Sequence, residues 1–312
     1  MRYQTSAAKL ADIGVAVRAA LARMLRDGLD FTIRVYEKAG QDDIFFLAGA
    51  IAFNILLAAI PFLLLVVGII GFVLPRLFEN PQQTAVDYIL SVLPASKALV
   101  LYARNFVDGL IAERARTGLL GLALFVWASA RLFGSLRSVM KSVFDLQEDR
   151  GVISGKIFDL KMVFVTGILF IANTGITLVL EAVQTFGIAW LGIGEGEQLR
   201  AIRAAYAQLL AFFFTFVMFV LVYRYLPTRR TPWRISLVAA TFTGVVWESM
   251  KGAFAWYVTN VGSYTTTYGA LATLIILVFW IYYSAVVFIL GGEVAQVYEL
   301  SRIRRRQKEL LE

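Results

Sequence analysis

Residues 44 to 74 form one apolar run of thirty-one residues without a charge, and this run limits the possible fold more than any other feature. As a straight helix it would be about 46 Å long, at about 1.5 Å per residue, whereas the hydrocarbon core of a bilayer is about 30 Å thick. The run therefore predicts a membrane-spanning helix that has to tilt or bend.

Two residues inside this run are unusual for a membrane helix. Pro61 lies near the middle, where its ring removes a backbone N–H donor and clashes with the carbonyl group of Leu57. Asn54 brings an amide into the apolar segment. One interpretation is a proline kink, with Asn54 hydrogen-bonded to a neighbouring helix. The other is a helix that breaks beside a polar cavity.

The composition of the chain supports a membrane location. Apolar residues make up 59% of it, whereas roughly half is usual in soluble domains. Cysteine and histidine are both absent, which excludes disulfides, thiolate chemistry, imidazole bases and the common zinc sites. We expect no cofactor, no metal site and no enzymatic activity. The basic N-terminal segment has no apolar core followed by a cleavage site, so no removable signal peptide is expected.

The other long apolar stretches predict an all-α protein with six membrane crossings, because none alternates apolar and polar residues as barrel strands do. Residues 1–43 have the spacing of an amphipathic helix on the membrane surface. Residues 75–117 hold prolines and apolar runs too short to cross, which indicates interfacial helices or a dip into the bilayer. Residues 293–312 form a basic tail. Within a transmembrane domain of residues 44–292, the expected spans are 44–74, 118–136, 162–186, 204–223, 235–258 and 269–292.

The distribution of basic residues gives the expected orientation. Of the 30 lysines and arginines, 22 lie in the two terminal segments and in the second and fourth connections between spans. The first, third and fifth connections hold only seven. The positive-inside rule therefore predicts that both termini are cytoplasmic.

Four stretches, taken together and in this order, resemble the BrkB/YihY family of membrane proteins, which also carries the historical name ribonuclease BN. The resemblance implies a bacterial inner-membrane protein with six helices, a proline in the first and a Gly-Gly-Glu or Gly-Ala-Glu ending in the last. It implies no settled activity. Phe53 and Asn54 depart from the pattern, since Tyr-type aromatic residues are expected there. The four stretches are residues 52–65, 124–150, 223–234 and 268–297.

Two oppositely charged residues in the fifth expected span are candidates for a binding site. Glu248 and Lys251 are three residues apart, so on a helix they share a face and can form an ion pair. Each alone would cost about 2.5–3.5 kcal/mol near the bilayer centre. The pair is either a structural contact, with Lys251 reaching toward the outer surface, or a charge site in a water-filled cavity.

A polar stripe in the second expected span is another candidate. Arg131 lies near the inner end of this span, where its guanidinium can reach headgroup phosphates. Ser135 and Ser138 follow it at helical spacing. Either Arg131 simply extends to the headgroups, or the stripe holds an anionic headgroup.

Two tyrosines extend the candidate set. Tyr282 lies in the middle of the sixth expected span and needs a hydrogen-bond partner. The partner is either a neighbouring backbone group, or Asn54, or the charged pair of the fifth span. Tyr268 belongs to the hydroxyl-rich segment 263–269, which suits an outer cap over an opening or a plain tight connection.

The carboxylates on the expected cytoplasmic side have two interpretations. Glu293 is either a gate that pairs with Arg224 or Arg229, or a solvated carboxylate at a helix end. A nuclease would need several oxygen ligands around a metal pair. The acids available for it flank basic residues in a connecting segment, where a solvated turn is the expected structure. They are Asp145, Glu148 and Asp149.

Three functional hypotheses follow. The favoured one is transport or translocation of an anionic amphiphile, such as a lipid, or of an ion, through a polar groove between the first, second, fifth and sixth helices. In it Pro61 is the hinge, and Arg131 with the charged pair holds the substrate. The second is a non-transporting scaffold or envelope-integrity protein, and the third, least favoured, is a ribonuclease. Membrane lipids are the expected partners, a homo-oligomer is compatible with the sequence, and no specific nucleic acid is expected, because basic clusters beside spans serve anionic lipids.

Overall fold

Helices joined by short turns form the part of the protein that the computed structural model describes. This part comprises residues 4–77, 80, 82–83, 105, 107–109, 111–147, 151–191, 197–260 and 270–311. The all-α prediction is therefore confirmed. Each expected span lies within one long helix, except that Gly269 falls outside the described residues. The long helices are α1 (Gln4–Gln41), α2 (Ile44–Leu77), α5 (Arg114–Val143), α6 (Val152–Leu191), α7 (Glu197–Tyr225), α8 (Trp233–Asn260) and α10 (Ala270–Glu309).

Within the described residues, four helical segments are long and apolar enough to cross a membrane. They are α2, α5, the Gln208–Tyr225 part of α7 and the Leu274–Glu309 part of α10. The count of six crossings stays a prediction. So does the interfacial region between the first two spans, because most of residues 75–117 lies outside the described part.

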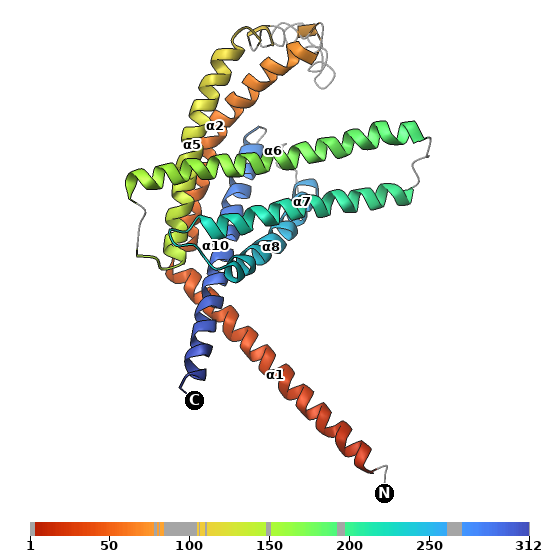
Figure 1. The fold of residues 1–312 in the computed structure, drawn as a ribbon, viewed down its shortest axis with the longest axis vertical. Helices are drawn as coiled ribbons and strands as arrows, with labels where there is room; N and C mark the ends of the chain where they lie inside the picture. Colours follow the sequence, from red (N-terminus) through yellow and green to blue (C-terminus); the bar gives the residue numbers. More distant parts are fainter. Residues whose placement is uncertain are drawn as a thin grey trace.

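Helices α2 and α5 run side by side along their lengths (Figure 1). Glycines make this close approach possible: a β-carbon on Gly68 would fall 2.3 Å from the Cα of Gly118, and one on Gly121 would fall 2.6 Å from the backbone nitrogen of Leu65. Small residues at such interfaces are how membrane helices gain packing contacts without a hydrophobic driving force. Helix α2 continues through Pro61, so the interpretation of a helix broken at this proline is wrong.

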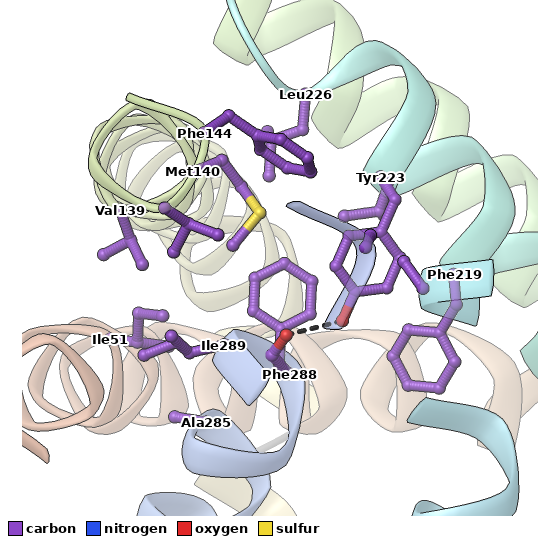
Figure 2. Close-up of a cluster of buried hydrophobic side chains, with 14 of the residues drawn as sticks. Ile51, Val139, Met140, Phe144, Phe219, Tyr223, Leu226, Ala285, Phe288 and Ile289 are labelled. Atoms are coloured by element: carbon purple, nitrogen blue, oxygen red, sulfur yellow. Dashed lines mark hydrogen bonds between the residues drawn. The ribbon is translucent and has the colours of Figure 1, made fainter. Parts of the chain in front are cut away.

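Helix α10 is the central element, because it packs against α1, α2, α5 and α8. The buried core lies around the middle of α10, where Ile289 meets Ile51 of α2 and Met140 of α5, while Phe288 stacks on Tyr223 of α7 (Figure 2). The Tyr223 hydroxyl donates a hydrogen bond to the Phe288 carbonyl oxygen over 2.5 Å. It also shares a hydrogen bond with the Thr243 hydroxyl of α8.

Helices α6 and α7 extend to one side of the α2–α5 pair (Figure 1). Helix α1 and the last part of α10 both project below this pair in the same view. An ion pair joins α5 to α6: Arg137 Nε lies 3.1 Å from Asp159 Oδ1, and Arg137 also donates to Oδ2 over 3.3 Å. The Arg137 side chain is 16% exposed. Asp159 is 1% exposed. The predicted cytoplasmic location of both termini stays a prediction.

Candidate functional site

Asn54 and Arg131 form an interhelical contact between α2 and α5. The Asn54 amide donates to the Ala50 carbonyl oxygen over 2.8 Å and accepts a hydrogen bond from Arg131 Nε over 3.2 Å. The prediction that Asn54 bonds to a neighbouring helix is confirmed. Arg131 is exposed and contacts α2 through this hydrogen bond. Ser135 lies half-buried one turn further along α5.

Glu248 and Lys251 form the ion pair that their spacing predicts. Lys251 Nζ lies 2.7 Å from Glu248 Oε1, and the lysine side chain is 43% exposed. Helix α8 packs against α7 and α10, whereas Asn54 and Arg131 lie in the α2–α5 contact. The Glu248–Lys251 pair thus lies within α8, whereas the Asn54–Arg131 pair joins α2 to α5.

An apolar groove opens between α8 and α10, with a volume of about 730 Å³. Aromatic rings line much of it, and Trp280 is packed against Phe254 with ring centres 4.5 Å apart. The groove lies between the fifth and sixth expected spans. Its size and lining suit an acyl chain. Lining side chains include Phe254, Tyr257, Phe279, Trp280, Tyr283 and Val287.

The two candidate tyrosines have separate outcomes. The Tyr282 hydroxyl donates to the Phe45 carbonyl oxygen of α2 over 3.2 Å, so its partner is a neighbouring backbone group rather than Asn54 or the charged pair. Tyr268 lies outside the described residues.

Glu293 is fully buried, with 0% exposure, so the expectation of a solvated carboxylate is wrong. It does not meet Arg224 either, because that guanidinium stacks 3.8 Å above the Trp233 ring and donates to the Thr231 carbonyl oxygen. Glu293 directly follows the sixth expected span, which ends at residue 292, and it lies beside Asp42 in the turn between α1 and α2 and beside Asp145 at the end of α5.

Lysine and acidic side chains from three elements surround this carboxyl group. Lys38 of α1 forms ion pairs of 2.7 Å with Asp42 and 3.0 Å with Asp145. Gln296 of α10 donates to Asp145 over 3.4 Å. Burial would lower the pKa of Lys38, but its hydrogen bonds to Asp42 and Asp145 raise it. We call Lys38, Asp42, Asp145 and Glu293 the carboxyl cluster.

Two aspartates in left-handed backbone conformation position the cluster. Asp43 (φ 48°) forms the turn from α1 into α2, and its carbonyl oxygen accepts the first bonds of α2, from Phe46 and Leu47. Asp145 (φ 49°) ends α5 in a Schellman motif, in which the Leu146 N–H bonds to the Lys141 carbonyl oxygen. Aspartate tolerates this conformation better than most residues. Both turns therefore hold an acid by conformational preference.

Sequence reasoning missed Lys38, Asp42, Arg137 and Asp159 as members of polar contacts. The carboxyl cluster joins residues more than a hundred positions apart, which no local pattern reveals. The available signal was the Gly-Gly pair directly before Glu293. A β-carbon on Gly292 would fall 2.8 Å from Val143, so these glycines bring α10 close to α5 and bury the next residue.

A polar groove of about 580 Å³ lies between α1 and the last part of α10. Arg34 of α1 and Arg302, Arg304 and Lys308 of α10 line it, with Asp27 bridged to Arg305 at 3.9 Å. A basic groove at this end suits anionic headgroups. Of the acids that a nuclease would need, Asp145 is held by Lys38 and Gln296, and Glu148 and Asp149 lie outside the described residues.

The helices, their apolar spanning segments and the polar contacts between them define an integral membrane protein. The chain matches the family model "Virulence factor BrkB" over residues 35–311 and belongs to that family. The family resemblance found in the sequence is thus confirmed.

Similar proteins carry the name UPF0761 membrane protein. The one from Alkalilimnicola ehrlichii is 27% identical over 90% of this chain, and the one from Aeromonas salmonicida is 24% identical over 88%. The chain spans 61% of the Alkalilimnicola protein and 90% of the Aeromonas protein. A relative from Chlorobium phaeobacteroides, of which 54% is covered, is 24% identical. No solved structure matches the chain significantly.

Proposed function

We propose that the protein is a transport protein of the bacterial inner membrane that moves an anionic lipid-like amphiphile. The apolar groove between α8 and α10 carries this proposal, because an open groove of about 730 Å³ beside hydrocarbon accepts an acyl chain. Every residue that lines this groove belongs to α8 or α10. The proposal therefore replaces the polar groove between four helices that the sequence predicts.

Selection of the substrate depends on its charged end. Lipid tails are as apolar as the walls of the groove, so chain contacts alone give no preference over the bilayer. Lys251 directly follows Met250, which lines the groove, and its ammonium group is partly exposed. An anionic headgroup therefore binds Lys251 by displacing Glu248 from the ion pair. Arg131, bonded to Asn54 through one of its five N–H donors, is a second cation at membrane depth.

A scaffold without transport activity is the competing function. It is favoured by the separation of the Asn54–Arg131 and Glu248–Lys251 pairs and by the packed core around α10. The two functions differ in what they predict for lipid movement.

Reconstitution separates these functions. Purified protein in vesicles of phosphatidylglycerol and phosphatidylcholine would carry a tail-labelled fluorescent version of either lipid, and a membrane-impermeant reductant would report the label that reaches the outer leaflet. We expect the phosphatidylglycerol probe to move faster than in protein-free vesicles. We also expect Lys251→Met to slow the movement of the phosphatidylglycerol probe more than the movement of the phosphatidylcholine probe. Movement no faster than in protein-free vesicles would instead support the scaffold.

A further inference from the structure

Glu293 is a fully buried carboxyl group in a cluster of acids, with 0% exposure. Helix α10 supplies Glu293, α1 and its turn supply Lys38 and Asp42, and the end of α5 supplies Asp145. If every group were ionised, three negative charges would face one positive charge. Asp145 is 60% exposed, whereas Asp42 is 14% and Glu293 0% exposed. Two buried acids beside one lysine are costly unless one of the acids is neutral.

The single lysine of the cluster is directed at the other two acids. Lys38 bonds to Asp42 and Asp145, and within the described part of the chain neither carboxyl oxygen of Glu293 receives a hydrogen bond from an N–H or O–H donor. Two ionised carboxylates have no proton to share. A hydrogen bond between Glu293 and Asp42 therefore requires that one of them holds a proton.

Glu293 is the member of this pair that takes the proton. Burial raises the pKa of Glu293, the hydrogen bond and charge of Asp42 and the charge of Asp145 raise it further, and Lys38 opposes this effect. Asp42 is the member of this pair that is bonded to Lys38.

We propose that Glu293 and Asp42 form a proton-binding site, in which one proton bridges the two carboxyl groups and fastens the turn between α1 and α2 to α10. The proton is exchanged with cytoplasmic water, and its loss leaves two adjacent carboxylates that repel each other. Since Glu293 binds the proton more tightly when buried than when exposed, the contact is strongest at low pH. It weakens as the pH rises through the raised pKa of Glu293.

Infrared difference spectroscopy detects this proton directly. We expect the carbonyl band of a protonated carboxyl group in the detergent-purified full chain, lost only at a pH above the ordinary range of glutamate. Glu293→Gln removes the band. Asp42→Asn moves its loss to lower pH, and it serves as the second variant if Glu293→Gln fails to fold. Glu299→Gln, the same substitution further along α10, is the control that leaves the band unchanged.

Distance measurements test the fastening of α1. The chain has no cysteine of its own, so spin labels at Met24→Cys and Leu310→Cys report only on α1 and the end of α10, at positions that are 74% and 86% exposed. We expect the distance distribution to change as the pH rises, and Glu293→Gln to keep the low-pH distribution throughout.

Three results would overturn the proposal. The first is a carbonyl band that persists in Glu293→Gln. The second is an unchanged pH of band loss in Asp42→Asn. The third is a pH response of the spin labels that is the same in the wild type and in Glu293→Gln. None depends on lipid transport, so failure of the proposed function leaves these results interpretable.

Discussion

Gly291 of α10 lies so close to Thr243 of α8 that a β-carbon at position 291 would fall 1.9 Å from the Thr243 hydroxyl oxygen. The same β-carbon would fall 2.5 Å from the Tyr223 hydroxyl. This glycine lets three helices meet around a shared set of hydrogen bonds, where α7, α8 and α10 exchange buried contacts.

Gly291→Ala is expected to destabilise the protein by about 1–3 kcal/mol, the usual cost of overpacking a core, despite the better helix propensity of alanine. The thermal unfolding midpoint in detergent measures the loss. Thr243→Ala in the same chain should restore part of it by removing the nearest atom. Gly252→Ala, where a β-carbon meets nothing within 4 Å, is the matched control and should lose no stability.

Gly121→Ala should separate α2 from α5, because its β-carbon would fall on the backbone of Leu64 and Leu65, which cannot rotate away as a side chain does. We expect a lower unfolding midpoint than in Gly167→Ala, whose β-carbon has open space. Equal midpoints for the two variants would show that α2 and α5 are not in such close contact.

Breaking the Arg137–Asp159 pair at Asp159 should cost up to about 3–5 kcal/mol, because the Asp159 carboxylate is 1% exposed and accepts two hydrogen bonds from Arg137. Asp159→Asn tests this in the same unfolding assay. The exposed Asp27–Arg305 pair gives the comparison: Asp27→Asn should change stability by about 1 kcal/mol or less. Similar losses for the two asparagine variants would contradict the burial of Asp159.

The Asn54–Arg131 contact should contribute about 0.6 kcal/mol, and at most about 1.7 kcal/mol, to the free energy of unfolding, as interhelical hydrogen bonds in membranes do. A double-mutant cycle with Asn54→Leu and Arg131→Leu measures this coupling free energy. If the double variant loses the sum of the stability losses of the two single variants, the two side chains do not interact.

The sequence is enough to predict the contacts that depend on local spacing. Apolar run length predicts the helices, and the three-residue spacing of Glu248 and Lys251 predicts their ion pair. The groove between α8 and α10 and the carboxyl cluster depend on which helices pack together, and that is not encoded in any one segment. Glu293 shows the difference: it looks like a solvated helix-end acid until α1 and α5 are placed against it.

Filling the α8–α10 groove tests the proposed transport most directly. Ala253 lines the groove, and Ala253→Trp in the phosphatidylglycerol vesicle assay should reduce probe movement to the rate of protein-free vesicles. Val245→Trp adds the same ring on an exposed part of α8 outside the groove lining and should retain the wild-type rate. Wild-type movement in Ala253→Trp, with the protein correctly inserted, would contradict a route through this groove.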